Sequence, residues 1–153
     1  MEKEPTQGMN YMSDKIFVDT NILVYAHDQD SGEKHATALA IVKDIWEKRI
    51  GVLSNQVLQE FYIAVTRKIQ KPIAKSEARE ILRAYSCWSI KEINPVSIIR
   101  ATEIEERHRI SFWDALVIVA AYEANCERIL TEDLNSGQII EGVLIENPFK
   151  VKK

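Results

Sequence analysis

The chain has 153 residues, 46% of them hydrophobic and 28% charged, which is ordinary for a folded domain and too apolar for a disordered protein. One domain with one hydrophobic core is expected at this length. The formal net charge of −3 argues against a surface that binds polyanions in general. It leaves room for a nucleic-acid enzyme whose acidic pocket is flanked by local basic residues.

The sequence contains no stretch long enough to span a membrane. The longest uninterrupted apolar run, from Ala115 to Tyr122, has eight residues, whereas a helix that crosses a bilayer needs roughly twenty. The N-terminus lacks the hydrophobic segment of a signal peptide. We therefore expect a cytoplasmic protein without a membrane partner.

The cysteines and histidines carry little functional signal. Cys87 and Cys126 lie far apart without a C-x-x-C spacing, so they are expected to be reduced, inert thiols. The three histidines form no metal-binding pattern, which argues against a zinc site of the usual spacing. They are expected on solvated faces, at His27, His35 and His108.

The predicted domain covers residues 15–148. Residues 1–14 before it are polar and aperiodic and are predicted to form a tail. Residues 149–153 after it form a basic tail, either frayed or a further contact to phosphate. The domain is predicted to begin with a strand at about 15–19, followed by a short apolar segment and a turn at 28–32.

Strands and helices alternate along the rest of the chain. Apolar residues recur at helical spacing from Glu33 to Lys48, which predicts an amphipathic helix. A strand at 51–54 leads into a helix that Asn55 caps and Pro72 halts, near residue 70. The remaining predictions are a helix capped by Ser76 to about Ser86, a strand near 88–93, a helix from Asn94-Pro95 to about His108, a helix from Ser111 to about Asn125, and strands at 128–131 and 143–145.

This alternation predicts an α/β fold, with a mainly parallel sheet and helices on both faces. Ligands of such sheets bind beyond the carboxyl ends of the strands. Four acidic residues lie at positions that suit this edge. Asp19 closes one strand, Asp133 follows another by two residues, Asp114 begins a helix, and Glu60 lies within one. We expect their side chains to meet.

Each of these acids also has a purely structural explanation. Asp19 can cap a turn or a helix, and Ser111 and Asp114 have the spacing of a capping box. Glu60 falls about 60° from Val57 on a helical wheel, at the margin of the apolar stripe, where a glutamate is often only solvated. Asp133 can belong to an ordinary turn. The conjunction of the four, rather than any one of them, favours a functional site.

Carboxylates that crowd together repel one another unless they share protons or a cation. Mg²⁺ and Mn²⁺ prefer oxygen ligands, and they bind through a few carboxylates together with substrate phosphate. The chemistry expected is phosphoester hydrolysis, with a water activated by metal and no histidine or serine nucleophile.

The residues around these acids resemble the acidic signature of PIN-domain nucleases, in particular the VapC-type ribonuclease toxins of prokaryotic toxin–antitoxin modules. The resemblance covers about residues 15–148. It is carried by four short segments, Asp19-Thr20-Asn21, Gln59-Glu60-Phe61, Ser111-Phe112-Trp113-Asp114-Ala115 and Thr131-Glu132-Asp133.

The resemblance implies that Asp19, Glu60 and Asp114 hold the metal and that Asp133 ligates it directly or through water. Because Glu132 and Asp133 are adjacent, which of the two faces the metal stays open. Side chains implied to support these carboxylates through hydrogen bonds are those of Asn21, Ser111 and Thr131. It also implies a three-layer α/β/α fold with a sheet of four or five strands, a homodimer, and an antitoxin whose tail lies across the active-site groove.

Basic residues near the acids are candidates for binding RNA phosphates. Arg67, Lys68 and Lys71 lie at the end of the helix that carries Glu60, and Arg109 precedes Asp114, as does Arg107. An ordinary solvated helix end explains them equally well. The three tryptophans can stack on bases but are expected to pack in the core, at positions 46, 88 and 113.

The expected function is thus a Mg²⁺- or Mn²⁺-dependent ribonuclease, the toxin of a type II toxin–antitoxin pair. The alternatives are a housekeeping RNA-processing nuclease and a catalytically silent module that binds RNA or protein. A dinucleotide-binding protein would have G-x-G-x-x-G after its first strand, where Asp19 stands. A phosphatase resembling the haloacid dehalogenases would have a second acid where Asn21 stands.

Overall fold

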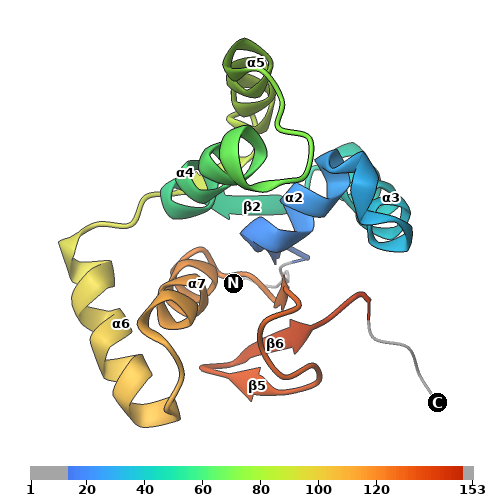
Figure 1. Ribbon diagram of the computed structural model, residues 1–153. Coiled ribbons are helices and arrows are strands. Elements are labelled where there is room, and N and C mark those ends of the chain that lie inside the picture. The colour runs from blue at the N-terminus through green and yellow to red at the C-terminus, as the bar shows by residue number, and fades with distance from the viewer. Residues whose placement is uncertain (1–13, 150–153) are drawn as a thin grey trace, which may run out of the picture.

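A computed structural model describes residues 14–149, in which one sheet is flanked by helices (Figure 1). The sheet has six strands in the order β3-β2-β1-β4-β6-β5, and every pairing is parallel except that between β5 and β6. The prediction of an α/β fold with a mainly parallel sheet is therefore confirmed. The strands are β1 (Ile16–Val18), β2 (Gly51–Ser54), β3 (Ser89–Lys91), β4 (Arg128–Leu130), β5 (Ile139–Ile140) and β6 (Val143–Glu146).

The antiparallel edge strand β5 was missed at the sequence level, which predicted four or five strands. It has two residues and is joined to β6 by a two-residue turn, Glu141-Gly142, with φ of 51° and 80°. Positive φ at both positions is the geometry of a tight hairpin. A strand this short carries no detectable alternation of apolar residues.

Six α-helices surround the sheet in the described part of the chain. In Figure 1, α6 and α7 lie on one side of β2, and α4 and α5 lie on the other. α2 packs against α3 and α4, while α7 contacts β2, β4 and β6. The helices are α2 (Thr20–His27), α3 (Glu33–Lys48), α4 (Asn55–Ile63), α5 (Lys75–Tyr85), α6 (Pro95–His108) and α7 (Phe112–Glu123). No helix within residues 14–149 is both long and apolar enough to cross a bilayer.

The core is built on β1 and α7. Phe17 and Val18 of β1 are fully buried, and the seven consecutive residues Ala115–Ala121 of α7 are buried as well. A helix that is apolar on every side is stable only where neighbours cover its whole surface, and α6 covers the side of α7 that the sheet does not. The central position of α7 fixes its N-terminus, where Asp114 lies.

Several predicted boundaries hold and others are corrected. The helix 33–48, the strand 51–54 and the helix 95–108 are confirmed, and Asn94 caps the last of these through Ser97 N. α4 is capped by Ser54, not Asn55, because the Asn55 side chain instead accepts a hydrogen bond from Ile93 N. After Ile63 the chain continues as a π-helical turn, Ala64–Lys68.

The start of α5 and the segment after β1 also differ from expectation. α5 begins at Lys75 with Ala74 at its N-cap, so Ser76 is a helical residue rather than a cap. The apolar segment after β1 is the helix α2, eight residues long. The predicted tails, residues 1–14 and 149–153, lie almost entirely outside the described residues.

An aromatic cluster joins α3, α5 and the residue before β3. Buried Tyr85 contacts Trp46 and Trp88, with ring centroids 5.1 and 5.4 Å away. Trp88 is half-buried, but Trp46 is 39% exposed, which contradicts the expectation that the tryptophans pack in the core. Trp113 contradicts that expectation, because 61% of its surface is exposed at the start of α7.

The histidines are half-buried and hydrogen-bonded rather than solvated. His27 Nε2 lies 2.8 Å from the Tyr85 hydroxyl, and His35 and His108 lie against Tyr25 O and Glu141. The cysteines are unpaired thiols, as predicted, with Cys87 exposed and Cys126 buried.

A substitution at Gly51 tests the packing of the aromatic cluster. A Cβ atom at Gly51 would collide with the Trp88 ring and approach Ile45 Cγ2 to 2.8 Å. Replacing Gly51 with alanine should therefore lower the free energy of unfolding by about 1–3 kcal/mol, as overpacking does. Urea unfolding should show a clearly smaller loss when the same change is made in a Trp88→Ala background. Equal losses in the two backgrounds would contradict the packing described here.

Candidate functional site

Asp19 lies where β1 ends and α2 begins. Its Oδ1 accepts a hydrogen bond from Thr20 N at 2.7 Å, so it caps α2, and its backbone N–H donates to Leu130 O of β4. Only 6% of its surface is exposed. The capping explanation is thus correct for one oxygen, and the second oxygen faces the neighbouring strand end.

Thr131, immediately after β4, connects the acidic residues. Its buried hydroxyl donates to Asp19 Oδ2 at 2.8 Å. The same oxygen accepts from Asp133 N at 3.1 Å and from Asn21 Nδ2 at 3.4 Å. This single hydroxyl therefore fixes the loop after β4 to the end of β1.

Asn21 and Asp133 complete this side of the site. Asn21 Nδ2 donates to Asp133 Oδ2 at 3.0 Å, so the amide holds a carboxylate that is otherwise exposed. Asn21 Oδ1 is buried and has no hydrogen-bond partner among residues 14–149. The orientation of the Asn21 amide is thus set by the two groups that accept from its nitrogen, Thr131 and Asp133.

Glu132 is turned to other partners than its neighbour Asp133. It accepts a hydrogen bond from the Tyr25 hydroxyl and forms an ion pair with Lys34 at 2.8 Å. Partial burial would raise the pKa of Glu132, but the bonds from Lys34 and Tyr25 hold it below its usual value. Glu132 is therefore an ion-paired carboxylate, and Asp133 is the one that lies beside Asp19 and Asn21.

Glu60 approaches the same edge from α4. Its Oε1 accepts from the Thr20 hydroxyl at 2.8 Å, and its Oε2 accepts from Gln56 Nε2 at 3.1 Å. Thr20 follows Asp19 directly, so Glu60 is held one residue away from the buried carboxylate. The side chain is exposed, as its position at the margin of the apolar stripe predicts.

Asp114 lies in the first turn of α7, where Ser111 Oγ accepts from Asp114 N at 3.0 Å. Ser111 is therefore the predicted helix cap. The charge of Asp114 is one cause of the raised pKa of Asp133. Of the four acids, Asp19, Glu60 and Asp133 are linked through Thr20, Thr131 and Asn21 at the carboxyl edge of β1 and β4, whereas Asp114 acts on Asp133 through its charge alone.

Burial and mutual repulsion act together on the acids. Burial raises the pKa of Asp19 to about 7, against the hydrogen bonds from Thr131 and Thr20, and the charges of Asp133 and Glu60 raise it further. Partial burial also raises the pKa of Asp133, with the charge of Asp114 as the next cause. A cation at this edge would relieve the repulsion.

The donor set suits a hard divalent cation, because all four side chains offer only carboxylate oxygens. Within residues 14–149, however, no three His, Cys, Asp or Glu side chains are already arranged as a metal site. The carboxylates are thus gathered at one edge without closing around a common point. The chemistry of the residues fits Mg²⁺ or Mn²⁺.

A cavity of about 550 Å³ opens beside the acids. Asp19, Glu60 and Asp133 line it, and so does Lys68. Arg67, Lys71 and Arg109, the other basic residues predicted to bind substrate, do not line it. Arg109 instead ends α6 in a left-handed conformation.

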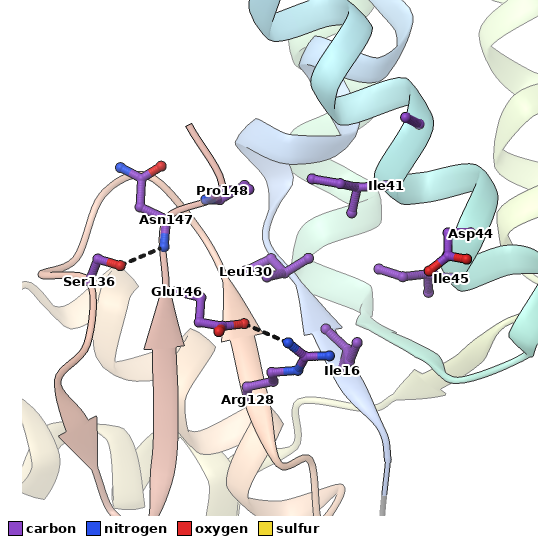
Figure 2. A pocket seen from close by; sticks show the side chains of 11 residues that line it. Ile16, Ile41, Asp44, Ile45, Arg128, Leu130, Ser136, Glu146, Asn147 and Pro148 are labelled. Atoms are coloured by element: carbon purple, nitrogen blue, oxygen red, sulfur yellow. Dashed lines mark hydrogen bonds and ion pairs between the residues drawn. The ribbon is translucent and has the colours of Figure 1, made fainter. Parts of the chain in front are cut away.

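A second cavity, of about 580 Å³, lies between α3 and the strands β1, β4 and β6 (Figure 2). Arg128 and Glu146 form an ion pair across its floor at 2.8 Å, and Ile41 and Ile45 project from α3. None of the four acids lines this cavity. The acidic site and this cavity are therefore separate.

Comparison with known proteins identifies the fold family. The family model described as PIN domain matches residues 16–139. The chain belongs to the PIN domain family. No curated protein matches it in sequence.

Solved structures similar to this PIN domain are toxins and toxin–antitoxin complexes. The VapC20 toxin of Mycobacterium tuberculosis, described as cleaving the sarcin–ricin loop, is 22% identical with a TM-score of 0.59, over 75% of this chain and 87% of that one. A toxin–antitoxin complex from Klebsiella pneumoniae is 19% identical with a TM-score of 0.63, over 90% and 100%. VapBC2 of Rickettsia felis, bound to promoter DNA, is 19% identical with a TM-score of 0.60, over 86% and 97%. These likenesses concern the fold.

Two residues that contact the acids, Thr20 and Gln56, were not among the site residues predicted from the sequence. Both bind Glu60, so they set its orientation. A signal existed for Gln56, because residues four apart on a helix are neighbours. Thr20 belongs to the Asp19-Thr20-Asn21 segment that carries the resemblance, but that segment assigned it no role of its own.

The raised pKa of Asp19 predicts how the stability of the metal-free protein depends on pH. In the unfolded chain this carboxyl titrates near 3.8, whereas in the folded protein it does so near 7. Between these values the folded state keeps a proton that the unfolded state has lost, so the free energy of unfolding should fall as pH rises, by on the order of a few kcal/mol.

Urea unfolding in EDTA at about pH 4.5 and pH 7.5 measures this effect. Asp19→Asn should remove most of the decrease, because the amide does not titrate. The same pH dependence in the wild type and in the variant would contradict the assignment to Asp19.

Proposed function

We propose that this PIN domain is a Mg²⁺- or Mn²⁺-dependent endoribonuclease that acts as the toxin of a type II toxin–antitoxin pair. The observation that carries the proposal is the gathering of Asp19 and Asp133 around the Thr131 hydroxyl, at the sheet edge where parallel α/β proteins bind ligands. The similar solved structures support it, since they are VapC toxins and toxin–antitoxin complexes.

In this proposal Asp19 and Asp133 hold the cation from the ends of β1 and β4, and Asp114 and Glu60 complete the set. A bound cation would lower the pKa of a water for attack on phosphorus and stabilise charge on the leaving oxygen. Thr131 and Asn21 keep the first two carboxylates in position through the hydrogen bonds described above.

Other side chains have supporting tasks. Thr20 and Gln56 orient Glu60, and Ser111 starts the helix that presents Asp114. Lys68 neutralises a phosphate of the RNA at the cavity. The proposed partners are RNA as substrate, an antitoxin, and a second copy of this chain in a homodimer.

An RNA cleavage assay with mapped ends tests the chemistry. The wild type should cut RNA with Mg²⁺ or Mn²⁺ and not with EDTA. Asp19→Asn and Asp133→Asn should each reduce the rate by more than the roughly 10- to 100-fold typical of residues that only support a metal ligand. Glu132→Gln is the matched control, because Glu132 is adjacent to Asp133 but bound to Tyr25 and Lys34, and it should stay within a fewfold of the wild type.

Activity that survives chelation and both aspartate substitutions would contradict the proposed mechanism. Expression in bacterial cells separates a toxin from a housekeeping nuclease. The toxin should arrest growth and Asp114→Asn should relieve the arrest, whereas a housekeeping nuclease should cause none. Equal loss of activity in Glu132→Gln and Asp133→Asn would contradict the assignment of Asp133.

A further inference from the structure

The cavity beside the acids is lined by side chains of two kinds. Asp19, Glu60 and Asp133 are acidic, whereas Val24, Tyr25, Ile63 and Ala64 are largely apolar, and we call these four the apolar half. Val24 and Tyr25 follow Asn21 by three and four residues on α2, so they share its helix face. The apolar half therefore directly adjoins the site residues.

The π-helical turn after α4 brings Lys68 to this cavity. Four residues of an α-helix turn about 40° beyond a full turn, so Ala64 lies about 40° past Glu60. The π-helical turn begins at Ala64, where Ile69 N donates to Ala64 O, five residues earlier, at 3.1 Å. Each residue of a π-helix turns the chain through a smaller angle than a residue of an α-helix does. Lys68 consequently returns toward the face of Glu60.

The small side chain at Ala64 leaves space between these groups. Glu60, Ala64 and Lys68 all line the cavity. Along this segment a carboxylate is followed by a small side chain and then by an ammonium group. The cavity volume of about 550 Å³ lies within the range of about 300–1,000 Å³ common for small-ligand sites. A ligand with a flat, apolar group joined to an anion would suit a cavity in which apolar side chains lie beside a lysine.

We infer that the apolar half of the cavity binds one nucleobase of the RNA beside the scissile phosphate, and that Lys68 binds the phosphate of an adjacent nucleotide. The inference rests on the proposed function and adds a subsite that reads a base. Charge favours RNA over a peptide, because a cation held by the acids would, together with the ammonium of Lys68, make the cavity attractive to successive phosphates. The free energy falls when the faces of a base leave water and pack against apolar side chains.

Binding of RNA with single abasic sites tests the inference. The probe is a fluorescein-labelled phosphorothioate RNA of about ten nucleotides, measured by anisotropy with Ca²⁺ and checked on a gel for integrity. A series of such RNAs lacks the base at a different position in each member. For the wild-type protein, removing the base at one position, which we call the dominant position, should reduce the affinity at least about fivefold, and removing any other should have a smaller effect.

Ala64→Leu fills the proposed base subsite. It should bind intact RNA at least about fivefold more weakly, and the dominant abasic position should no longer matter. Ala36→Leu, at an exposed position of α3, is the matched control and should behave as the wild type. Val24→Ala, which shortens the apolar wall without adding bulk, should also reduce the abasic effect. Thermal unfolding of each variant checks that it is folded.

Lys68→Met tests the phosphate contact. The slope of log affinity against log salt should become shallower by about one unit, whereas Lys43→Met, at an exposed position of α3, should leave it unchanged. An unchanged slope in Lys68→Met would overturn the role of Lys68.

Other outcomes overturn the base subsite itself. A flat abasic scan in the wild type does so. So does an Ala64→Leu variant that weakens the binding of intact RNA and of RNA abasic at the dominant position by the same factor, so that the abasic effect persists. Unchanged binding of intact RNA by Ala64→Leu, the result expected if the apolar half receives a peptide, overturns it as well. Metal-dependent cleavage with a flat scan would leave the nuclease proposal standing. A dominant abasic position without cleavage would support the subsite and contradict the nuclease.

Discussion

The site depends on one hydroxyl group, that of Thr131. β1 and β4 are parallel neighbours with Val18 opposite Leu130, so the residues that follow these strands emerge side by side at the same edge. Asp19 and Thr131 are those residues. The hydroxyl donates to Asp19 and accepts from Asp133 N and Asn21, and it is fully buried. Together with the backbone N–H of Thr20, this donor offsets part of the free energy that burying the carboxylate costs.

This arrangement links the stability of the fold to the chemistry of the site. Burial raises the pKa of Asp19 to about 7, and the nearby charges of Asp133 and Glu60 add to the effect. Ionised Asp19 in the metal-free protein therefore carries a cost of burial, increased by repulsion from the other acids, and a divalent cation would offset both. Proteins commonly accept such a cost at sites that must bind a ligand. The buried core of β1 and α7 supplies the compensating stability.

Much of this architecture could be predicted from the sequence. The apolar run that stops at Asp19, the Asn94-Pro95 helix start and the Ser111 cap were read correctly, because each depends on residues close together in the chain. Features set by tertiary contacts were not. β5 is too short for a pattern, and the choice between Glu132 and Asp133 rests on Tyr25 and Lys34, more than ninety residues away. Likewise, Lys68 differs from its neighbour Arg67 in the same π-helical turn because only Lys68 of the two lines the cavity.

Metal affinity of Thr131→Val tests the central role of this hydroxyl most directly. Valine keeps the buried volume close to that of threonine but leaves Asp19 Oδ2 without its donor and Asp133 N without its acceptor. Calorimetric titration with Mn²⁺ should give a dissociation constant about 10- to 100-fold higher than that of the wild type. Thr102→Val, an exposed threonine of α6, is the control and should bind as the wild type does. A folded Thr131→Val protein with unchanged Mn²⁺ affinity would contradict the account.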